Sequence, residues 1–237
     1  RSTLSSSSAA SDVYKRQALQ FIIVALLGTW IANNVKQVTV IYFIKYNLQL
    51  EPYFGLILLG VILQIMLGAL ATNLIKNIFE KKIIFIMGTA LYVVTDLIIY
   101  FITGYENFWL FAFVGSFGFI GFGMAGVATW SMLADSVEFG EWKSGFRSEG
   151  IINSSFVCIF KLSIGFSGWL AGMILESTNY QPNEIMQNSE TLEGLFIMGY
   201  IFPAVAGTIA MLIMAFHKYD SSFYDTVFSD LRSERKS

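Results

Sequence analysis

The sequence predicts an all-α membrane protein, a bundle of six membrane-spanning helices, and two observations lead to that fold class. Hydrophobic residues make up 55% of the 237 residues and charged residues only 14%, whereas ordinary soluble chains carry about 25% charged residues. The apolar residues also stand in long blocks, and blocks of about 18 or more indicate transmembrane helices. The mean hydropathy of +0.60 is typical of such a chain.

Six apolar blocks can be placed along the chain, each long enough to cross a hydrocarbon core of about 30 Å at about 1.5 Å per residue. They run over Ala18–Ile44, Tyr53–Ile75, Ile83–Thr103, Phe108–Leu133, Gly150–Leu175 and Leu195–Phe216. Barrel strands would be shorter and would alternate in polarity. We therefore expect a helical bundle over residues 18–217, a tail over 218–237, and a non-native or disordered Ser- and Ala-rich segment over 1–17.

Basic residues in the connections predict the orientation, because they favour the cytoplasmic side of a membrane. One side of the bundle would carry only Lys45, next to several glutamates. The other side would carry Lys76, Lys81, Lys82, Lys143, Arg147, Lys218, Arg232, Arg235 and Lys236. We expect both ends of the bundle in the cytoplasm, with the 134–149 loop inside and the 176–194 loop outside.

Composition argues against several classes of function. A net charge of −2 does not suit a nucleic-acid partner. The single cysteine, Cys158, cannot form a disulfide framework or a multi-cysteine metal site. The blocks contain no histidine and no paired acids at membrane depth, so neither an embedded enzyme nor a metal cluster is expected. The sequence predicts no enzyme, no cofactor and no resident metal.

Lys161 is a candidate site residue because it lies in the middle of its apolar block. Helical spacing places Asn153, Gly165, Gly168 and Gly172 on about the same face, and glycines let another helix approach closely. An ionisable group at membrane depth costs at least about 2.5–3.5 kcal/mol on insertion scales, so Lys161 should face protein or water. It would be a donor or counter-charge at a transport site, or else a structurally paired or snorkelling lysine.

The first block carries a second polar face. Asn33, Lys36 and Gln37 share it by their i, i+3, i+4 spacing. This pattern predicts a wet cavity wall, and the alternative is a kinked helix packed on polar neighbours. Asp96 in the third block is interpreted as structural, either paired with a lysine or near the outer interface.

Three further features admit two interpretations each. Trp130 belongs to an interfacial aromatic belt or offers a stacking platform for a sugar ring. The glycines of the fourth block provide close packing or bending; they are Gly115, Gly118, Gly121, Gly123 and Gly126. The mixed charges of the 134–149 loop form a solvated face or a latch to another part of the protein.

The segment Trp130–Gly150, WSMLADSVEFGEWKSGFRSEG, resembles a specific family motif. The pattern is W-x-M-x-A-D-x-x-D/E-Y/F-G-E-W/Y-K and then R-x-E-G/S, the inner loop of the glycoside–pentoside–hexuronide:cation symporters. These are the melibiose-carrier-like branch of the major facilitator superfamily. Ile41–Tyr46 also resembles the Y-Y-F-x-Y that ends the seventh helix, and Phe160–Gly165 resembles part of the eleventh. The resemblance covers about Ala18 to Arg235, the family's helices seven to twelve.

The resemblance implies roles for several residues. Lys161 matches a lysine at the cation and sugar site, Trp130 matches a tryptophan of the sugar cavity, and Lys36 matches a basic position of many members. With Asn33, Gln37 and Asn153 they form the expected substrate site, and Lys161 is also expected to couple the cation. Residues expected to gate the cytoplasmic side are Asp135, Glu138, Arg147 and Glu149.

The expected function is symport of Na⁺ or H⁺ with a glycoside, oligosaccharide, pentoside or hexuronide across a bacterial cytoplasmic membrane. The expected partners are the sugar, the monovalent cation, the lipid bilayer and an amino-terminal six-helix half that this chain lacks. The family's cation-binding acids lie in that half, so we expect no transport by this chain alone. The alternative is a carrier of a non-sugar solute or lipid without cation coupling.

Overall fold

The computed structural model describes residues 27–144, 149–182, 184 and 186–216, and these ranges contain helices and connections but no β-strand. A helical segment over 27–42 continues into the π-helix η1 (Phe43–Asn47). The elements that follow are η2 (Glu51–Tyr53), α2 (Phe54–Ile75), α3 (Lys81–Ile98), η3 (Ile99–Thr103), α4 (Phe108–Ser144), α5 (Glu149–Ser177), α6 (Ser189–Phe196), η4 (Ile197–Ile201) and α7 (Phe202–Phe216).

Five helices in the described ranges are long and apolar enough to cross a membrane, which confirms the all-α membrane prediction for this part of the chain. They cover Glu51–Ile75, Lys81–Thr103, Phe108–Asp135, Phe156–Ser177 and Ser189–Phe216. The first predicted block begins at Ala18, in residues outside the described ranges, and its described part is helical over 27–47. The segments 1–17 and 218–237 also lie outside those ranges.

Helix α4 corrects one expected boundary. A loop was expected from residue 134, whereas α4 continues to Ser144 and α5 already begins at Glu149. The charged residues there show where the apolar block ends, but no proline stands between Leu133 and Ser144 to stop the helix. At about 1.5 Å per residue, α4 is about 55 Å long and exceeds the hydrocarbon thickness.

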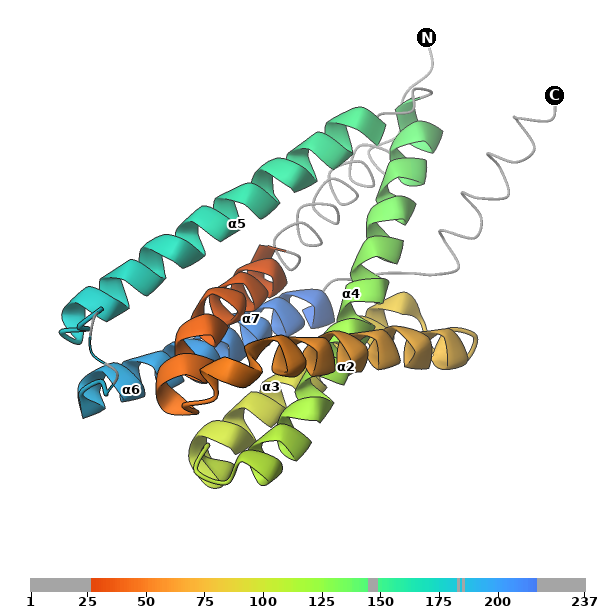
Figure 1. Cartoon of the computed structure of the whole chain (residues 1–237). Coiled ribbons are helices and arrows are strands. Elements are labelled where there is room, and N and C mark those ends of the chain that lie inside the picture. The colour runs from red at the N-terminus through yellow and green to blue at the C-terminus, as the bar shows by residue number, and fades with distance from the viewer. Residues whose placement is uncertain (1–26, 145–148, 183, 185, 217–237) are drawn as a thin grey trace, which may run out of the picture.

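Helix α4 packs closely against α2 and α3 (Figure 1), and glycines make the closest contacts. A Cβ atom at Gly123 would collide with the carbonyl oxygen of Ile65 on α2, and one at Gly68 would collide with that of Ile120 on α4. On the α3 side, Gly88 and Gly121 approach in the same way. These glycines therefore serve close packing, as small residues do in membrane helix interfaces.

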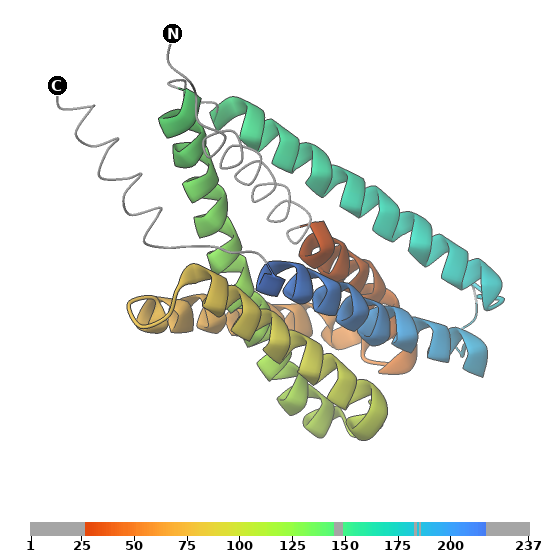
Figure 2. The ribbon, with the colours of Figure 1, turned by 180° about the vertical axis from the view of Figure 1, so that it is seen from behind.

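The 27–47 segment and the continuous helix 189–216 lie in the middle of the bundle, and α5 lies at its edge in both views (Figures 1 and 2). The 27–42 segment contacts α5 through a small apolar cluster built on Val35, Ala171 and Met198. Three π-helical turns meet at one end of the bundle, where Phe43, Ile99, Phe196 and Tyr200 form a buried cluster. We call this the Tyr46 end, and the opposite end the Lys81 end.

Replacing Gly123 with alanine should destabilise the bundle, because the added methyl group meets backbone atoms of α2 that cannot rotate away. We expect a loss of about 1–3 kcal/mol, the usual cost of overpacking, measured by thermal unfolding of the detergent-purified chain. Gly126→Ala is the matched control on the same helix, since a Cβ atom there meets nothing within 4 Å. Equal stability of the two variants would contradict the packing described.

Candidate functional site

A buried ion pair joins the 27–42 segment to α3. The Lys36 ammonium group contacts Oδ1 of Asp96, and the two side chains are 13% and 1% exposed. Asp96 lies near the end of α3, on the side that faces the centre of the bundle. Of the two alternatives expected for Asp96, the structure has the pairing with a lysine. Removing one partner of a buried pair leaves the other charge uncompensated, so the pair fixes how the two helices face each other.

Aromatic rings surround the same ammonium group. Nζ of Lys36 lies 4.6 Å from the ring centroid of Tyr92, 4.8 Å from that of Tyr200 and 5.4 Å from that of Phe119. Such rings attract a cation by their negative faces and stabilise it away from water. The lysine is thus held by one carboxylate and three rings, from α3, α4 and η4.

Lys36 also borders a cavity of about 380 Å³, within the size range of ordinary solute sites. The cavity lies between the 27–47 segment and α2, and residues of α3, α4 and η4 complete its wall. Asn33, Lys36 and Gln37 all line it, so the face expected from their spacing does border one cavity. Most of the remaining wall is apolar, including Phe54, Leu58, Phe119 and Phe122.

Three buried polar atoms on α3 lack a hydrogen-bond partner among the described residues: Oγ1 of Thr89, the hydroxyl of Tyr92 and Oδ2 of Asp96. Their i, i+3, i+7 spacing places them along one face of the helix. Buried polar atoms are normally satisfied by protein or by water. Tyr92 lines the cavity and Asp96 contacts Lys36, so this unsatisfied face adjoins the cavity.

The opposite face of the 27–42 segment meets α5. Nδ2 of Asn34 donates a hydrogen bond of 2.7 Å to Oγ of Ser163. One turn earlier, Trp30 packs edge-on against Phe160 on α5, with ring centroids 4.8 Å apart. Trp130 on α4 joins this aromatic cluster through Phe156, at 4.9 Å between ring centroids, yet remains 54% exposed. Trp130 therefore presents a free part of its ring beside α5.

Lys161 lies on the exposed side of α5, and no hydrogen bond or ion pair joins it to another described residue. Gly165, Gly168 and Gly172 have open space where a Cβ atom would stand. The close helix approach expected at these glycines is therefore not made by any described part of the chain. Asn153 belongs to α5, but its side chain is not described. The expected substrate residues are thus divided between the cavity and the α5 face.

Two of the expected gate residues, Asp135 and Glu138, lie on α4 toward the Lys81 end. Asp135 on α4 is 5% exposed and forms an ion pair with Lys81 at the start of α3, with 2.7 Å between Nζ and Oδ1. It therefore ties two helices of this same bundle. Glu138 is half-buried on α4. Arg147 lies outside the described ranges, and so does the side chain of Glu149.

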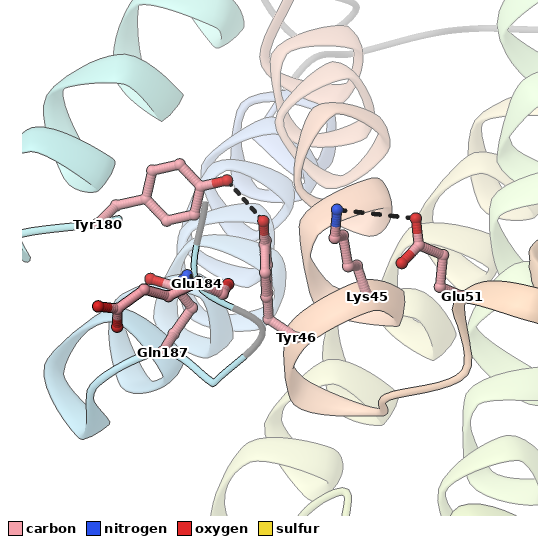
Figure 3. A network of polar contacts seen from close by, with 6 residues as sticks. All are labelled: Lys45, Tyr46, Glu51, Tyr180, Glu184 and Gln187. Atoms are coloured by element: carbon pink, nitrogen blue, oxygen red, sulfur yellow. Dashed lines mark hydrogen bonds and ion pairs between the residues drawn. The ribbon is translucent and has the colours of Figure 1, made fainter. Parts of the chain in front are cut away.

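The Tyr46 end has its own polar contacts (Figure 3). The hydroxyls of Tyr46 and Tyr180 lie 2.7 Å apart and share a hydrogen bond. Tyr180 belongs to the connection after α5, so this bond joins the end of η1 to that connection. Burial and the hydrogen bond with Tyr46 raise the pKa of Tyr180 to about 12. Beside them, Lys45 approaches Glu51 at 3.7 Å, and Nε2 of Gln187 donates to the backbone oxygen of Glu184.

Sequence reasoning missed the site around Asp96. Tyr92 and Tyr200 gave no signal, because aromatic residues are frequent in every block. Asp96 was recognised as an unusual acid, but its lysine partner lies 60 positions away and only the packing of the helices reveals it.

Comparisons with known proteins agree with this architecture. A family model described as MFS/sugar transport protein matches residues 1–221. The putative sulfoquinovose importer of Escherichia coli (strain K12) is 30% identical over 207 residues, 86% of this chain and 43% of that protein. The putative 2,3-dihydroxypropane-1-sulfonate exporter of the same organism is 28% identical over 222 residues, 92% of this chain and 47% of that protein. The isoprimeverose transporter of Lactiplantibacillus pentosus is 29% identical over 192 residues, 81% of this chain and 40% of that protein. The chain spans less than half the length of these relatives.

Asp96→Asn should destabilise the bundle, because it leaves the Lys36 ammonium without its carboxylate. We expect a loss of about 3–5 kcal/mol, as found when one partner of a buried pair is removed. The double variant Lys36→Met, Asp96→Asn removes both charges and should recover most of that loss, again by thermal unfolding in detergent. If the double variant loses as much unfolding free energy as the two single variants added together, the two charges do not interact.

The Tyr46–Tyr180 contact should weaken only at high pH. The folded-state pKa of Tyr180 lies above its usual value of 10.0, so its contribution is complete below about pH 10 and is lost as pH rises through about 12. Ultraviolet difference titration of the chain against its Tyr180→Phe variant isolates this phenol. Tyr46→Phe should move the titration of Tyr180 toward the usual range, and an unchanged titration would contradict the bond.

Proposed function

We propose, since the chain belongs to the MFS/sugar transport protein family, that it forms one six-helix half of a secondary carrier for a sugar-like solute. The exposed faces of the bundle support this carrier function. In this proposal a second six-helix half meets the bundle, and the solute binds between the two halves. Rocking of one half against the other then opens the site to each side of the membrane in turn.

The observation that carries the proposal is the uncovered face of α5 around Lys161. Lys161 is exposed there, and the glycines that follow it have nothing packed against them within the described ranges. A lysine at membrane depth avoids hydrocarbon and faces a cavity or protein. A solute path along this face supplies the water and polar partners that the ammonium group needs.

Trp130, which packs on α5 through Phe156, suits recognition of a sugar-like solute. Its ring is fixed on one side by Phe156 and leaves 54% of its surface exposed. A pyranose has an apolar C–H face that can stack on an aromatic plane, while its hydroxyls can accept hydrogen bonds from an ammonium group. Trp130 would orient the ring, and Lys161 would bind hydroxyl or anionic groups at its edge.

Coupling to Na⁺ or H⁺ is the second part of the proposal. The cationic Lys161 would repel a cation bound close by, so movement of its charge during the state change would link ion and solute. An effect of this kind requires that both ligands together favour a state that neither favours alone.

On this proposal both ends of the bundle are cytoplasmic, in a bacterial inner membrane, as the distribution of basic residues predicts. Asp135, Glu138, Arg147 and Glu149 would then close the cytoplasmic side.

Uptake by proteoliposomes tests these roles, using the intact carrier expressed from its complete coding sequence. Labelled sulfoquinovose, isoprimeverose and methyl β-D-glucoside are offered with an inward Na⁺ or H⁺ gradient. Trp130→Ala should weaken solute binding about tenfold, the scale of one lost stacking contact, and Trp130→Phe should retain most of it. Lys161→Gln should abolish accumulation against a gradient.

Trp109→Ala provides a matched control for that experiment. Trp109 lies on the same helix as Trp130 and is 81% exposed, but it stands at the other end of α4, where an interfacial tryptophan is expected. Its loss should leave solute affinity unchanged. Uptake that ignores both cation gradients would favour the alternative, a carrier without cation coupling, and uptake of none of the solutes would contradict the sugar-carrier proposal.

A further inference from the structure

The cavity beside Lys36 contains groups that the solute path along α5 does not use. The 27–42 segment separates the two places, since Trp30 and Asn34 face α5 while Asn33, Lys36 and Gln37 line the cavity. The cavity is mostly apolar, and its single described charge is the Lys36 ammonium. One Asp96 oxygen contacts that ammonium and the other has no hydrogen-bond partner among the described residues. Such an arrangement is a built site for a charged group.

We propose that Asp96 is a proton-binding site, and that its protonation releases Lys36 to bind the carboxylate or sulfonate group of a solute in this cavity. The inference rests on the proposed carrier function and adds a second ligand site to it. The proton enters the Asp96 carboxylate as the oxyanion of the solute replaces that carboxylate at Lys36. The proton comes from a hydronium ion, whose O–H bond breaks as the Asp96 O–H bond forms, and no other covalent bond changes.

Charge balance requires that the two ligands bind together. The Lys36–Asp96 pair has no net charge, and its side chains are 13% and 1% exposed. A proton alone would leave an uncompensated ammonium, and an anion alone would place two negative groups on one lysine. Either state is costly where water is excluded. Proton and oxyanion together restore a neutral site, so each favours binding of the other.

No other charged group of the described residues faces the pair. The side chains around the Lys36 ammonium are Tyr92 from α3, Tyr200 from η4 and the Phe119 ring from α4. The Tyr92 hydroxyl is buried and unpaired within the described ranges, so it is free to donate to a displaced carboxyl group. The ammonium group has three N–H donors and gives one to Asp96. The others are available to a ligand oxygen in the cavity.

An alkali ion suits this position less well than a proton. Lys36 already supplies one positive charge at Asp96, and a second cation at the same carboxylate would be repelled. The rings next to the pair offer only the hydroxyls of Tyr92 and Tyr200, whereas hard cations select several carboxylate, carbonyl or water oxygens. A proton needs one lone pair, and Oδ2 of Asp96 offers it.

Proton movement linked to solute uptake tests the inference. The intact carrier is placed in proteoliposomes that contain a pH-sensitive dye, with the membrane potential clamped by valinomycin and potassium. D-Glucuronate supplies a carboxylate, 2,3-dihydroxypropane-1-sulfonate a sulfonate, and methyl β-D-glucoside neither. We expect about one proton to enter the vesicle with each solute anion that is taken up. Comparison of D-glucuronate with 2,3-dihydroxypropane-1-sulfonate then shows whether the cavity takes a carboxylate or a sulfonate.

The variants separate the two roles. Asp96→Asn should still bind the oxyanion but lose the acidification that accompanies its uptake. Lys36→Met should weaken oxyanion binding by about 10- to 100-fold, the worth of a charge-assisted hydrogen bond. The double variant should lose both while keeping the fold, because no charge remains unpaired. Glu51→Gln is the control, since it removes the carboxylate of the exposed Lys45–Glu51 pair and should change neither readout.

Anion-linked acidification that persists in Asp96→Asn or in the double variant would overturn the inference, and so would oxyanion binding unaffected by Lys36→Met. Uptake of methyl β-D-glucoside with no uptake of either acid would overturn it as well, while leaving the proposed carrier function intact. Failure of all three solutes to enter would instead overturn the carrier function, and the inference with it.

Discussion

An ionised side chain inside the hydrocarbon layer must be compensated, and the rotation of the 27–42 segment follows from that constraint. Asp96 is fully buried on α3 and is tolerated because Lys36 is turned against it. Helical geometry then places Trp30 and Asn34 on the far side of the segment, where they contact α5. A single ion pair thus determines which residues border the cavity and which border the α5 face.

The cavity also depends on the glycines of α4. Gly121 lies against α3 and Gly123 against α2, so the backbones approach more closely than side chains would allow. Phe119 precedes these glycines in sequence, Phe122 lies between them, and both line the cavity. Larger residues at the glycine positions would push α4 outward and remove one wall. The close packing of three helices and the enclosure of Lys36 therefore have the same cause.

Local patterns were predictable from the sequence, whereas distant pairings were not. Long apolar blocks locate the spans because hydrophobic length alone decides them. The face shared by Asn33, Lys36 and Gln37 follows from helical periodicity, which needs no knowledge of the neighbours. The extension of α4 to Ser144 was missed, since charge marks the edge of the lipid and not the end of a helix. The Lys36–Asp96 pair depends on how two helices pack, and nothing in either local sequence specifies it.

The two intramembrane lysines differ in a way that bears on how such a bundle is used. Lys36 finds its counter-charge within the bundle and is surrounded by rings, so its charge is stabilised whatever meets the outer surface. Lys161 has no described partner and stands on an open face with glycines along it. Hydrocarbon would penalise that charge, so the α5 face requires water, a solute or an acidic group from elsewhere. In the proposed carrier, the solute path and the opposing half supply these partners of Lys161. The stability of the Lys161 charge therefore changes with the state of the site, whereas that of the Lys36 charge depends on Asp96.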